Sequence, residues 1–476
     1  MSTTKPRVLV VPVPAQGHVK PLMLFSHKLA KHGFRITFVN TEFNHKRILS
    51  AMNDHDEGSD KGLVPEIELV SIPDGLGPEN DRTDAIELAK CTLETIPAEI
   101  EKLITTINGG DGGGVSESSD DDKIRCVVSD VHMSWIMEVA AKMGVKGAVF
   151  CPSSAALSVY TMNIPKMLHD GILDRDGKPT KKQKIQLATG MPAMDTSKFP
   201  WNFGDLASQK MMFHHYFRTG QGLKMANWWL CNTAYEIEYV ALSLFPRFIP
   251  IGPLMKNDSH SSVDISGSQF WPEDSSCLNW LNQQKPRSVI YIAFGSFAVH
   301  DQAQFQELAL GLELTGRPFL WVVRPGFISN GDNSSFNPYD FLGNNSNNLG
   351  KIVSWAPQQK VLAHPSIACF VSHCGWNSTM EGLSNGVPFL CWPYFADQHL
   401  DKSYICDVWK VGMGFEPNVN GLISSEEVKN KVDKLLSDGD IRRRSLELKE
   451  IVTKNIAKDG QSSKNFNSFI KWLEEA

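Results

Sequence analysis

The feature that most constrains the fold is a repeated alternation of short apolar runs with longer amphipathic segments. The apolar run at residues 7–13 (RVLVVPV) has the length of a strand, and a helical spacing of Leu22, Phe25 and Leu29 follows it. Another strand-length run, RITFVNT, comes next at residues 35–41. Strands that alternate with helices in this way indicate a parallel sheet with helices on both faces.

The alternation occurs twice along the chain, which predicts two α/β domains. A stretch rich in Pro, Gly and Ser at residues 249–274 interrupts it, and a new series starts with SVIYIAFGS at residues 288–296. A chain of 476 residues is also long for one hydrophobic core. We therefore expect two Rossmann-like, doubly wound domains that face a cleft, with ligands at the carboxyl ends of the strands. The expected bounds are 1–253 for an N-terminal domain, 254–455 for a C-terminal domain, and 456–476 for a C-terminal helix that packs back on the N-terminal domain.

Composition excludes several classes of function. The net charge is −6 and no block is rich in Lys or Arg, so nucleic-acid binding has little electrostatic support. Nine cysteines are scattered without CxxC pairs, which indicates neither a disulfide framework nor a zinc site. The apolar run Val8 to Val13 is too short for a signal peptide or a membrane span. We expect a cytosolic monomer without a membrane span.

Polar side chains gather where strand and helix patterns meet in residues 370–398. A strand ends at His373, and Asn377 and Ser378 then fall in the first turn of a helix. The free N–H groups and positive dipole end of a helix suit a phosphate, and a Ser hydroxyl and a His ring N–H can add donors. Glu381 lies on the same helix face, where a carboxylate would repel phosphate but can accept two sugar hydroxyls, as on a ribose.

Further groups at neighbouring strand ends extend this set. Asp397 and Gln398 follow the next strand and are suitable partners for hexose hydroxyls, and Trp355 with Gln358 stands at another strand end, where an indole can stack on a base. Each residue alone has an ordinary explanation: a tryptophan in the core, a structural histidine, a solvated glutamate. Together they outline a pocket for a base, a ribose, a diphosphate and a sugar.

The segment from Trp355 to Gln398 resembles the signature box of plant UDP-dependent glycosyltransferases almost throughout. The resemblance extends to PAQGHVKPL near the N-terminus, to CVVSD, to AFGS and to the total length; Ser372, where Thr is more usual, is a mild departure. It implies a GT-B fold, with the nucleotide sugar held mainly by the C-terminal domain. It also implies UDP binding by Ser296, Trp355, Ala356, Gln358, His373, Asn377, Ser378 and Glu381, and sugar binding by Trp376, Asp397 and Gln398. Gln at this last position is typical of glucosyltransferases in the family, so UDP-glucose is the expected donor.

His18 and Asp130 are the candidate catalytic pair. His18 lies at the start of the first predicted helix, where a neutral imidazole can take a proton from an acceptor hydroxyl. Asp130 closes another strand and can orient the ring and stabilise the imidazolium. A structural histidine and a helix N-cap are the alternatives, which the resemblance makes less favoured. Attack on the anomeric carbon opposite the departing UDP would invert its configuration.

The acceptor is expected to be a small hydrophobic molecule, such as a flavonoid or another phenolic secondary metabolite, in the N-terminal domain. Loops near Met133, Trp135, Ser153 and Phe395 are expected to line its site. Its identity, the position modified and the choice between oxygen and carbon attack stay open. A UDP-sugar epimerase and a catalytically silent nucleotide-sugar binder on the same fold are the alternatives.

No metal is expected at the diphosphate. The chain has DxD spacings, but they lie in polar, turn-like segments where Asp is common for conformational reasons, and none borders the predicted UDP pocket in sequence. These pairs are Asp54/Asp56, Asp120/Asp122, Asp174/Asp176 and Asp438/Asp440.

Overall fold

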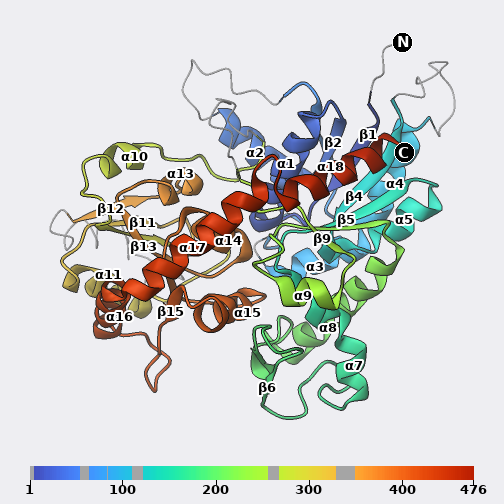
Figure 1. Ribbon diagram of the computed structural model, residues 1–476. Coiled ribbons are helices and arrows are strands. Elements are labelled where there is room, and N and C mark those ends of the chain that lie inside the picture. Colours follow the sequence, from blue (N-terminus) through green and yellow to red (C-terminus); the bar gives the residue numbers. More distant parts are fainter. Residues whose placement is uncertain are drawn as a thin grey trace. The chain divides into compact units, whose positions relative to one another are not determined.

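A computed structural model of the chain contains two compact units (Figure 1). The first comprises Met1–Thr189, Asp195–Pro272 and Asn455–Ala476, and the second comprises Gly190–Met194 and Glu273–Lys454. The first unit thus continues past residue 253 to Pro272 and includes the last helix of the chain. The structure describes residues 5–53, 64–82, 84–109, 122–255, 267–328 and 349–475.

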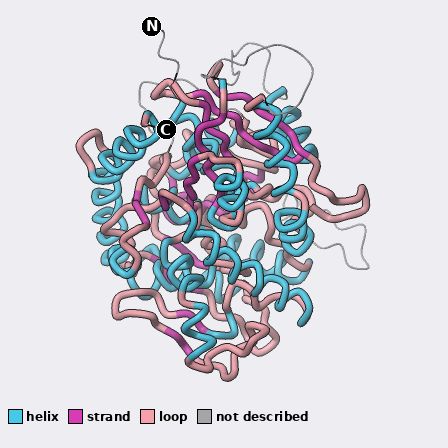
Figure 2. Tube along the Cα trace, turned by 90° about the vertical axis from the view of Figure 1, so that its right-hand side faces the viewer, coloured by secondary structure: helices cyan, strands magenta, loops and turns pink. Residues whose placement is uncertain are grey.

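The first unit is built on a parallel sheet of seven strands in the order β3-β2-β1-β4-β5-β8-β9. Valine is the commonest residue of the central strands β1, β4 and β5, and most of their side chains are buried, as in a sheet that is covered on both faces. The magenta strands in Figure 2 run between helices on either side. The strands are β1 (Arg7–Val11), β2 (Arg35–Thr41), β3 (Ile67–Ile72), β4 (Ile124–Asp130), β5 (Lys146–Cys151), β8 (Trp228–Cys231) and β9 (Phe248–Pro250); β6 (Lys184–Ile185) and β7 (Met194–Asp195) are short and lie outside this sheet.

The helices of the first unit lie between its successive strands along the sequence, and one more helix comes from the C-terminal end of the chain. The last helix, α18, is part of the same core as β1 and the first helix, because Phe466 and Phe469 pack against Phe25 with ring centroids 6.0 and 5.9 Å apart (Figure 1). The helices are α1 (Gln16–Ala30), α2 (Glu42–Asn53), α3 (Ala85–Glu94), α4 (Ile96–Ile107), α5 (Ile136–Lys142), α6 (Ala155–Met162), α7 (Ile164–His169), α8 (Leu206–Gly222), α9 (Tyr239–Leu244) and α18 (Gln461–Glu474).

The second unit repeats this architecture with six parallel strands in the order β12-β11-β10-β13-β14-β15. Its core packs the sheet against α11 and α16, and the predicted α/β class with two parallel sheets is confirmed. The strands are β10 (Val289–Ala293), β11 (Phe319–Val322), β12 (Gly350–Val353), β13 (Ile367–Ser372), β14 (Phe389–Cys391) and β15 (Gly412–Gly414). The helices are α10 (Ser276–Leu281), α11 (Gln302–Leu314), α13 (Gln358–Leu362), α14 (Trp376–Asn385), α15 (Gln398–Ser403), the π-helix η5 (Tyr404–Val408), α16 (Ser425–Ser437) and α17 (Gly439–Ile456).

Candidate active site

The register of two neighbouring strands brings His18 to Asp130. Strands β1 and β4 pair in parallel with Val11 opposite Ser129, so the turn after β1 begins beside the last residue of β4. Helix α1 starts at Gln16 and carries His18 in its first turn. The His18 Nδ1 atom lies 2.7 Å from Asp130 Oδ2, a hydrogen-bond distance across 112 residues of sequence.

Asp130 is ionised although its side chain is completely buried. Its Oδ1 atom accepts a hydrogen bond from the backbone N–H of His132 at 2.9 Å. Burial by itself would raise the pKa of Asp130, but the neighbouring His18 and His132 and their hydrogen bonds outweigh it, so this pKa lies below its ordinary value. An ionised carboxylate only accepts hydrogen bonds, so His18 Nδ1 carries the proton and its Nε2 presents a lone pair.

His132 is a neighbour of this pair that the sequence analysis missed. Its ring meets the His18 ring edge-on, with centroids 5.5 Å apart, and its Nε2 lies 3.4 Å from Ser153 Oγ. Burial, opposed in part by Asp130, lowers the pKa of His132 to about 4, so its ring is neutral at neutral pH. The signal was available in the sequence, since His132 stands two residues after Asp130 on the same strand end.

The side chains of Met133 and Trp135, near which loops are expected to line an acceptor site, are buried in the core, and the acceptor site itself stays a prediction. Met133 is completely buried, and Trp135 donates its indole N–H to the Thr92 carbonyl at 3.0 Å. The ring of Trp135 also packs edge-on against His215. Met133 ends the 3-10 turn that follows β4, and Trp135 is the N-cap of α5.

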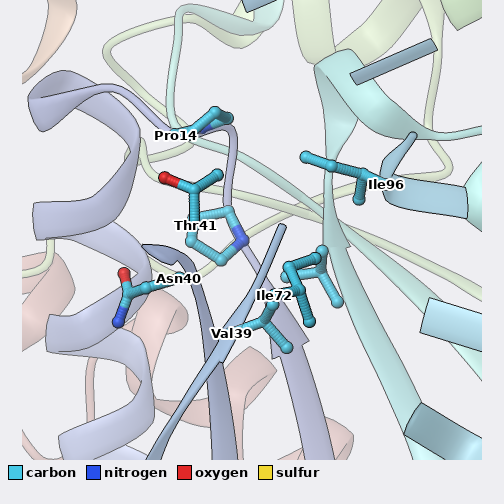
Figure 3. A pocket seen from close by; sticks show the side chains of 8 residues that line it. Pro14, Val39, Asn40, Thr41, Ile72 and Ile96 are labelled. Carbon is cyan, nitrogen blue, oxygen red and sulfur yellow. The ribbon is translucent and has the colours of Figure 1, made fainter. Parts of the chain in front are cut away.

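A small hollow lies at the carboxyl ends of β1, β2 and β3, the same sheet edge that carries Asp130 (Figure 3). Its lining is mostly apolar and includes Pro14, Val39, Ile72 and Ile96, and it has room for roughly one water molecule. Figure 3 shows Thr41 and Asn40 pointing in different directions from adjacent positions of β2. The hollow is too small for a phenolic acceptor.

A second set of polar side chains lies in the second unit and centres on Glu381, which is 3% exposed. Its two carboxylate oxygens accept hydrogen bonds from Gln358 Nε2 at 2.7 Å and Gln359 Nε2 at 3.0 Å. Gln358 Nε2 also lies 2.9 Å from Ser378 Oγ, and Gln358 Oε1 accepts from the Tyr291 hydroxyl at 3.1 Å. The structure therefore brings the predicted residues Gln358, Ser378 and Glu381 together, and it adds Tyr291 and Gln359, which the sequence analysis missed.

The turn between β13 and α14 is shaped around the His373 ring. A Cβ atom on Gly295 or Gly375 would lie 2.7 or 2.6 Å from His373 Nε2, and Gly295 has a φ of +70°, so both positions favour glycine. Burial lowers the pKa of His373 to about 4, and a neutral ring can still donate one N–H. Helix α14 starts next to this ring, with Gly375 at its N-cap and no side-chain cap on its first N–H groups.

The other residues that are predicted to bind UDP also belong to the second unit. Trp355 is half-buried, and its carbonyl accepts a hydrogen bond from the Asp274 N–H at 2.9 Å. Ala356 is buried beside it, Asn377 is half-buried in the first turn of α14, and Ser296 is half-buried just after β10.

The predicted sugar residues differ in what they can offer a ligand. Trp376 is 2% exposed, and its ring lies 6.2 Å from both Tyr404 and Trp409, so only its backbone is available. Asp397 is the half-buried N-cap of α15. The Oε1 atom of Gln398 accepts the Tyr394 N–H at 2.8 Å and the Phe395 N–H at 3.3 Å, which leaves the amide NH₂ as the group it can present.

Three of the four Asp pairs considered for metal binding have a member with other contacts, and one of these members is Asp122, which forms an ion pair with Arg35. Asp174 Oδ1 accepts the backbone N–H groups of Asp176 and Lys178, and Asp438 Oδ1 accepts the N–H of Ile441. Asp54, Asp56 and Asp120 lie outside the described residues. Within the described part of the chain, no group of three or more His, Cys, Asp or Glu side chains is arranged to hold a metal ion, and no helix is long and apolar enough to cross a bilayer.

Comparison with known proteins identifies the family. Residues 206–457 match the family described as UDP-glucoronosyl and UDP-glucosyl transferase. The chain is 44% identical over 474 residues to UDP-glycosyltransferase 83A1 of Arabidopsis thaliana, covering 99% of this chain and 97% of that one. It is 33% identical over 481 residues to (R)-mandelonitrile beta-glucosyltransferase of Prunus dulcis, covering 97% and 95%.

The fold comparison agrees with the sequence comparison. The crystal structure of Os79 from O. sativa in complex with UDP superposes with a TM-score of 0.77 at 25% identity, covering 98% of this chain and 100% of that chain. The chain belongs to the UDP-glucoronosyl and UDP-glucosyl transferase family and is a plant UDP-glycosyltransferase with a GT-B fold.

Proposed function

We propose that the enzyme transfers glucose from UDP-glucose to a hydroxyl group of a small hydrophobic acceptor, with inversion at the anomeric carbon and His18 as general base. The observation that carries this proposal is the 2.7 Å contact between His18 Nδ1 and Asp130 Oδ2. An epimerase would need acid and base groups around the sugar beyond His18, and a silent binder has no need for an oriented imidazole of this kind.

The proton transfer follows from the tautomer. Because Nδ1 donates to ionised Asp130, Nε2 is the ring atom that accepts the proton of the acceptor hydroxyl as its oxygen attacks the anomeric carbon. Asp130 then faces an imidazolium, and burial strengthens this attraction because the local dielectric constant is low. UDP departs from the face opposite the attacking oxygen, which inverts the configuration.

The donor is held by the second unit. The Glu381 carboxylate and Gln358 hold the ribose hydroxyls, and the ribose displaces or joins the hydrogen bonds that these side chains make to one another. Trp355 stacks on uracil and the Ala356 backbone pairs with it. The negative charge that develops on UDP is stabilised by the N-terminus of α14, with Asn377, Ser378, Ser296 and His373 as further donors and no metal ion.

Glucose is the proposed sugar because Gln398 presents an amide NH₂ that can donate to a hexose hydroxyl, next to the Asp397 carboxylate that can accept from one. Relatives of this chain are named as glucosyltransferases of small molecules, (R)-mandelonitrile and 7-deoxyloganetin, which supports both the sugar and the kind of acceptor. A flavonoid or another phenolic secondary metabolite fits the same acceptor class. All nine cysteines are free thiols, in keeping with a reducing compartment such as the cytosol.

The test is incubation with UDP-glucose, or with UDP-galactose in parallel, and a panel of phenols and alcohols. We expect UDP release matched by a β-glucoside, whose anomeric configuration is read from its proton spectrum, and a clear preference for UDP-glucose. Conversion of UDP-glucose to another UDP-sugar without acceptor would indicate an epimerase. Binding of UDP-glucose without turnover of any acceptor would indicate a silent binder.

A further inference from the structure

Two cysteines of the second unit, 15 positions apart in the sequence, have their sulfur atoms close together. The Sγ atom of Cys406 is 3.7 Å from the Sγ atom of Cys391, which is the last residue of β14. A disulfide requires about 2.05 Å between the sulfur atoms, so an approach of roughly 1.7 Å would bring the two atoms to bonding distance. Neither cysteine has been given a role in binding or catalysis above.

The backbone around Cys406 is unusual. Cys406 is the central residue of η5, a π-helix that continues α15 directly. π-Helical turns are rare and occur frequently at functional sites. The contact between the two sulfur atoms therefore joins the end of β14 to this π-helical turn.

The two thiols differ in reactivity in the way that a peroxide-sensing pair requires. Cys406 is partly exposed, and its hydrogen bond with Cys391 together with nearby Lys402 lowers the pKa of its thiol. Cys391 is buried, and burial raises its pKa well above the ordinary value. Cys406 is therefore the thiol that an oxidant reaches first, and Cys391 is a resolving thiol already in contact with it.

We infer that Cys406 and Cys391 form an oxidation site, at which hydrogen peroxide or another hydroperoxide converts the two thiols to a disulfide. The Cys406 thiolate attacks the O–O bond of hydrogen peroxide, which gives a sulfenic acid and, with one proton, a water molecule. The Cys391 thiol then attacks the sulfenic sulfur, the S–S bond forms, and the hydroxyl leaves with the Cys391 proton as a second water. Two thiols are oxidised, one peroxide is reduced to two waters, and a dithiol reductant reverses the change.

The disulfide would join the two ends of the segment that carries Asp397 and Gln398. Cys391 immediately precedes this segment, and Cys406 follows α15, which starts at Gln398. A shift of the strand end or of η5 is transmitted to these side chains, because the unit is close-packed and Trp392 is hydrogen-bonded to Ser372 at 2.8 Å. A displacement on the order of 1 Å at a reacting group can cost up to 100-fold in rate, so we expect at least a tenfold loss of turnover on oxidation. This consequence rests on the proposed sugar site, whereas the disulfide itself does not.

The test exposes the full-length enzyme to hydrogen peroxide, blocks free thiols, digests with trypsin and analyses the peptides by mass spectrometry. Cleavage at Lys402 and Lys410 isolates Cys406 on peptide 403–410, whereas Cys391 falls on peptide 361–402 together with Cys369 and Cys374. The variants are Cys406→Ser and Cys391→Ser. Cys277→Ser is the matched control, because this cysteine of α10 is buried and its thiol donates a hydrogen bond to the Asp274 carbonyl at 3.1 Å.

After oxidation we expect peptides 403–410 and 361–402 to be linked in the wild type and in Cys277→Ser. The linkage should be absent from Cys406→Ser and from Cys391→Ser, and dithiothreitol should remove it from every sample. Turnover of the wild type should fall as the linkage forms and recover with dithiothreitol. Turnover of Cys406→Ser should not fall in hydrogen peroxide. Absence of the linked peptides from the oxidised wild type, or their persistence in Cys391→Ser, would overturn the proposed pair. A linkage that forms without changing turnover would leave the pair intact and contradict the proposed role of the segment that contains Asp397 and Gln398.

Discussion

Each unit has a buried carboxylate among its proposed site residues, Asp130 at the end of β4 and Glu381 within α14, and the two have different partners. Asp130 in the first unit faces an imidazole, a group that can gain a proton near neutral pH. Glu381 in the second unit faces the amides of Gln358 and Gln359, which do not titrate. The neighbouring side chains therefore determine what each buried carboxylate can do.

This difference separates proton transfer from binding. A carboxylate beside a histidine stabilises the charge that appears when the ring takes a proton. A carboxylate held by amides, which do not titrate, can accept hydrogen bonds from neutral hydroxyl groups such as those of a ribose. Substitutions of Asp130 or His18 should therefore change turnover. Substitutions of Glu381 or of the glutamines beside it should change the affinity for UDP.

The largest effect is expected for His18→Ala. Loss of a positioned base should lower turnover of an alcohol acceptor by roughly 10²–10⁴-fold, while UDP affinity measured by calorimetry stays unchanged. His169→Ala is the matched control, because that ring is 89% exposed on α7, and its turnover should be normal. Near-normal turnover in His18→Ala would remove the histidine from the mechanism.

A smaller effect is expected for Glu381→Ala. Loss of a charged hydrogen-bond acceptor should weaken UDP binding by about 1.5–3 kcal/mol, whichever acceptor is present. Gln359→Ala removes only one donor to the same carboxylate and should cost about 1 kcal/mol or less. Unchanged UDP affinity in Glu381→Ala would show that this carboxylate does not hold the ribose.

The pH dependence of turnover and of UDP-glucose affinity should also distinguish the catalytic pair from the UDP-binding residues. Because the pKa of His373 is lowered to about 4, its ring stays neutral and the affinity for UDP-glucose should be flat between about pH 5.5 and 8. Transfer requires an unprotonated His18 ring, so a fall of turnover in acid should occur without a change in that affinity. An affinity for UDP-glucose that rises steeply as the pH falls would mean that His373 becomes charged and binds the diphosphate as a cation.

Chelation should have no effect. The N-terminus of α14 and its neighbouring donors are proposed to stabilise the departing UDP, so transfer in excess EDTA should continue at close to its full rate. A large loss that Mg²⁺ or Mn²⁺ restores would instead assign the diphosphate to one of the Asp pairs.

Strand ends were predictable from the sequence, and side-chain partners were less so. Alternating apolar runs located both sheets, and the residues that follow a strand, such as Asp130 and His373, were found because parallel strands end at one edge. His132, Tyr291 and Gln359 were missed because their roles depend on register and rotamer, which no local pattern encodes. The burial of Trp135 was not predictable for the same reason, since an aromatic residue near a strand end can point into the core as readily as toward a ligand.

The central claim is that His18 accepts the proton of the attacking hydroxyl. The most direct test measures turnover of the wild type and of His18→Ala with a series of phenols of increasing acidity. An acidic phenol ionises without help, so the ratio of the two rates should shrink steadily from about 10²-fold or more toward unity as the phenol becomes more acidic. A ratio that stays constant across the series would contradict the account, because His18 would then support the site without taking the proton.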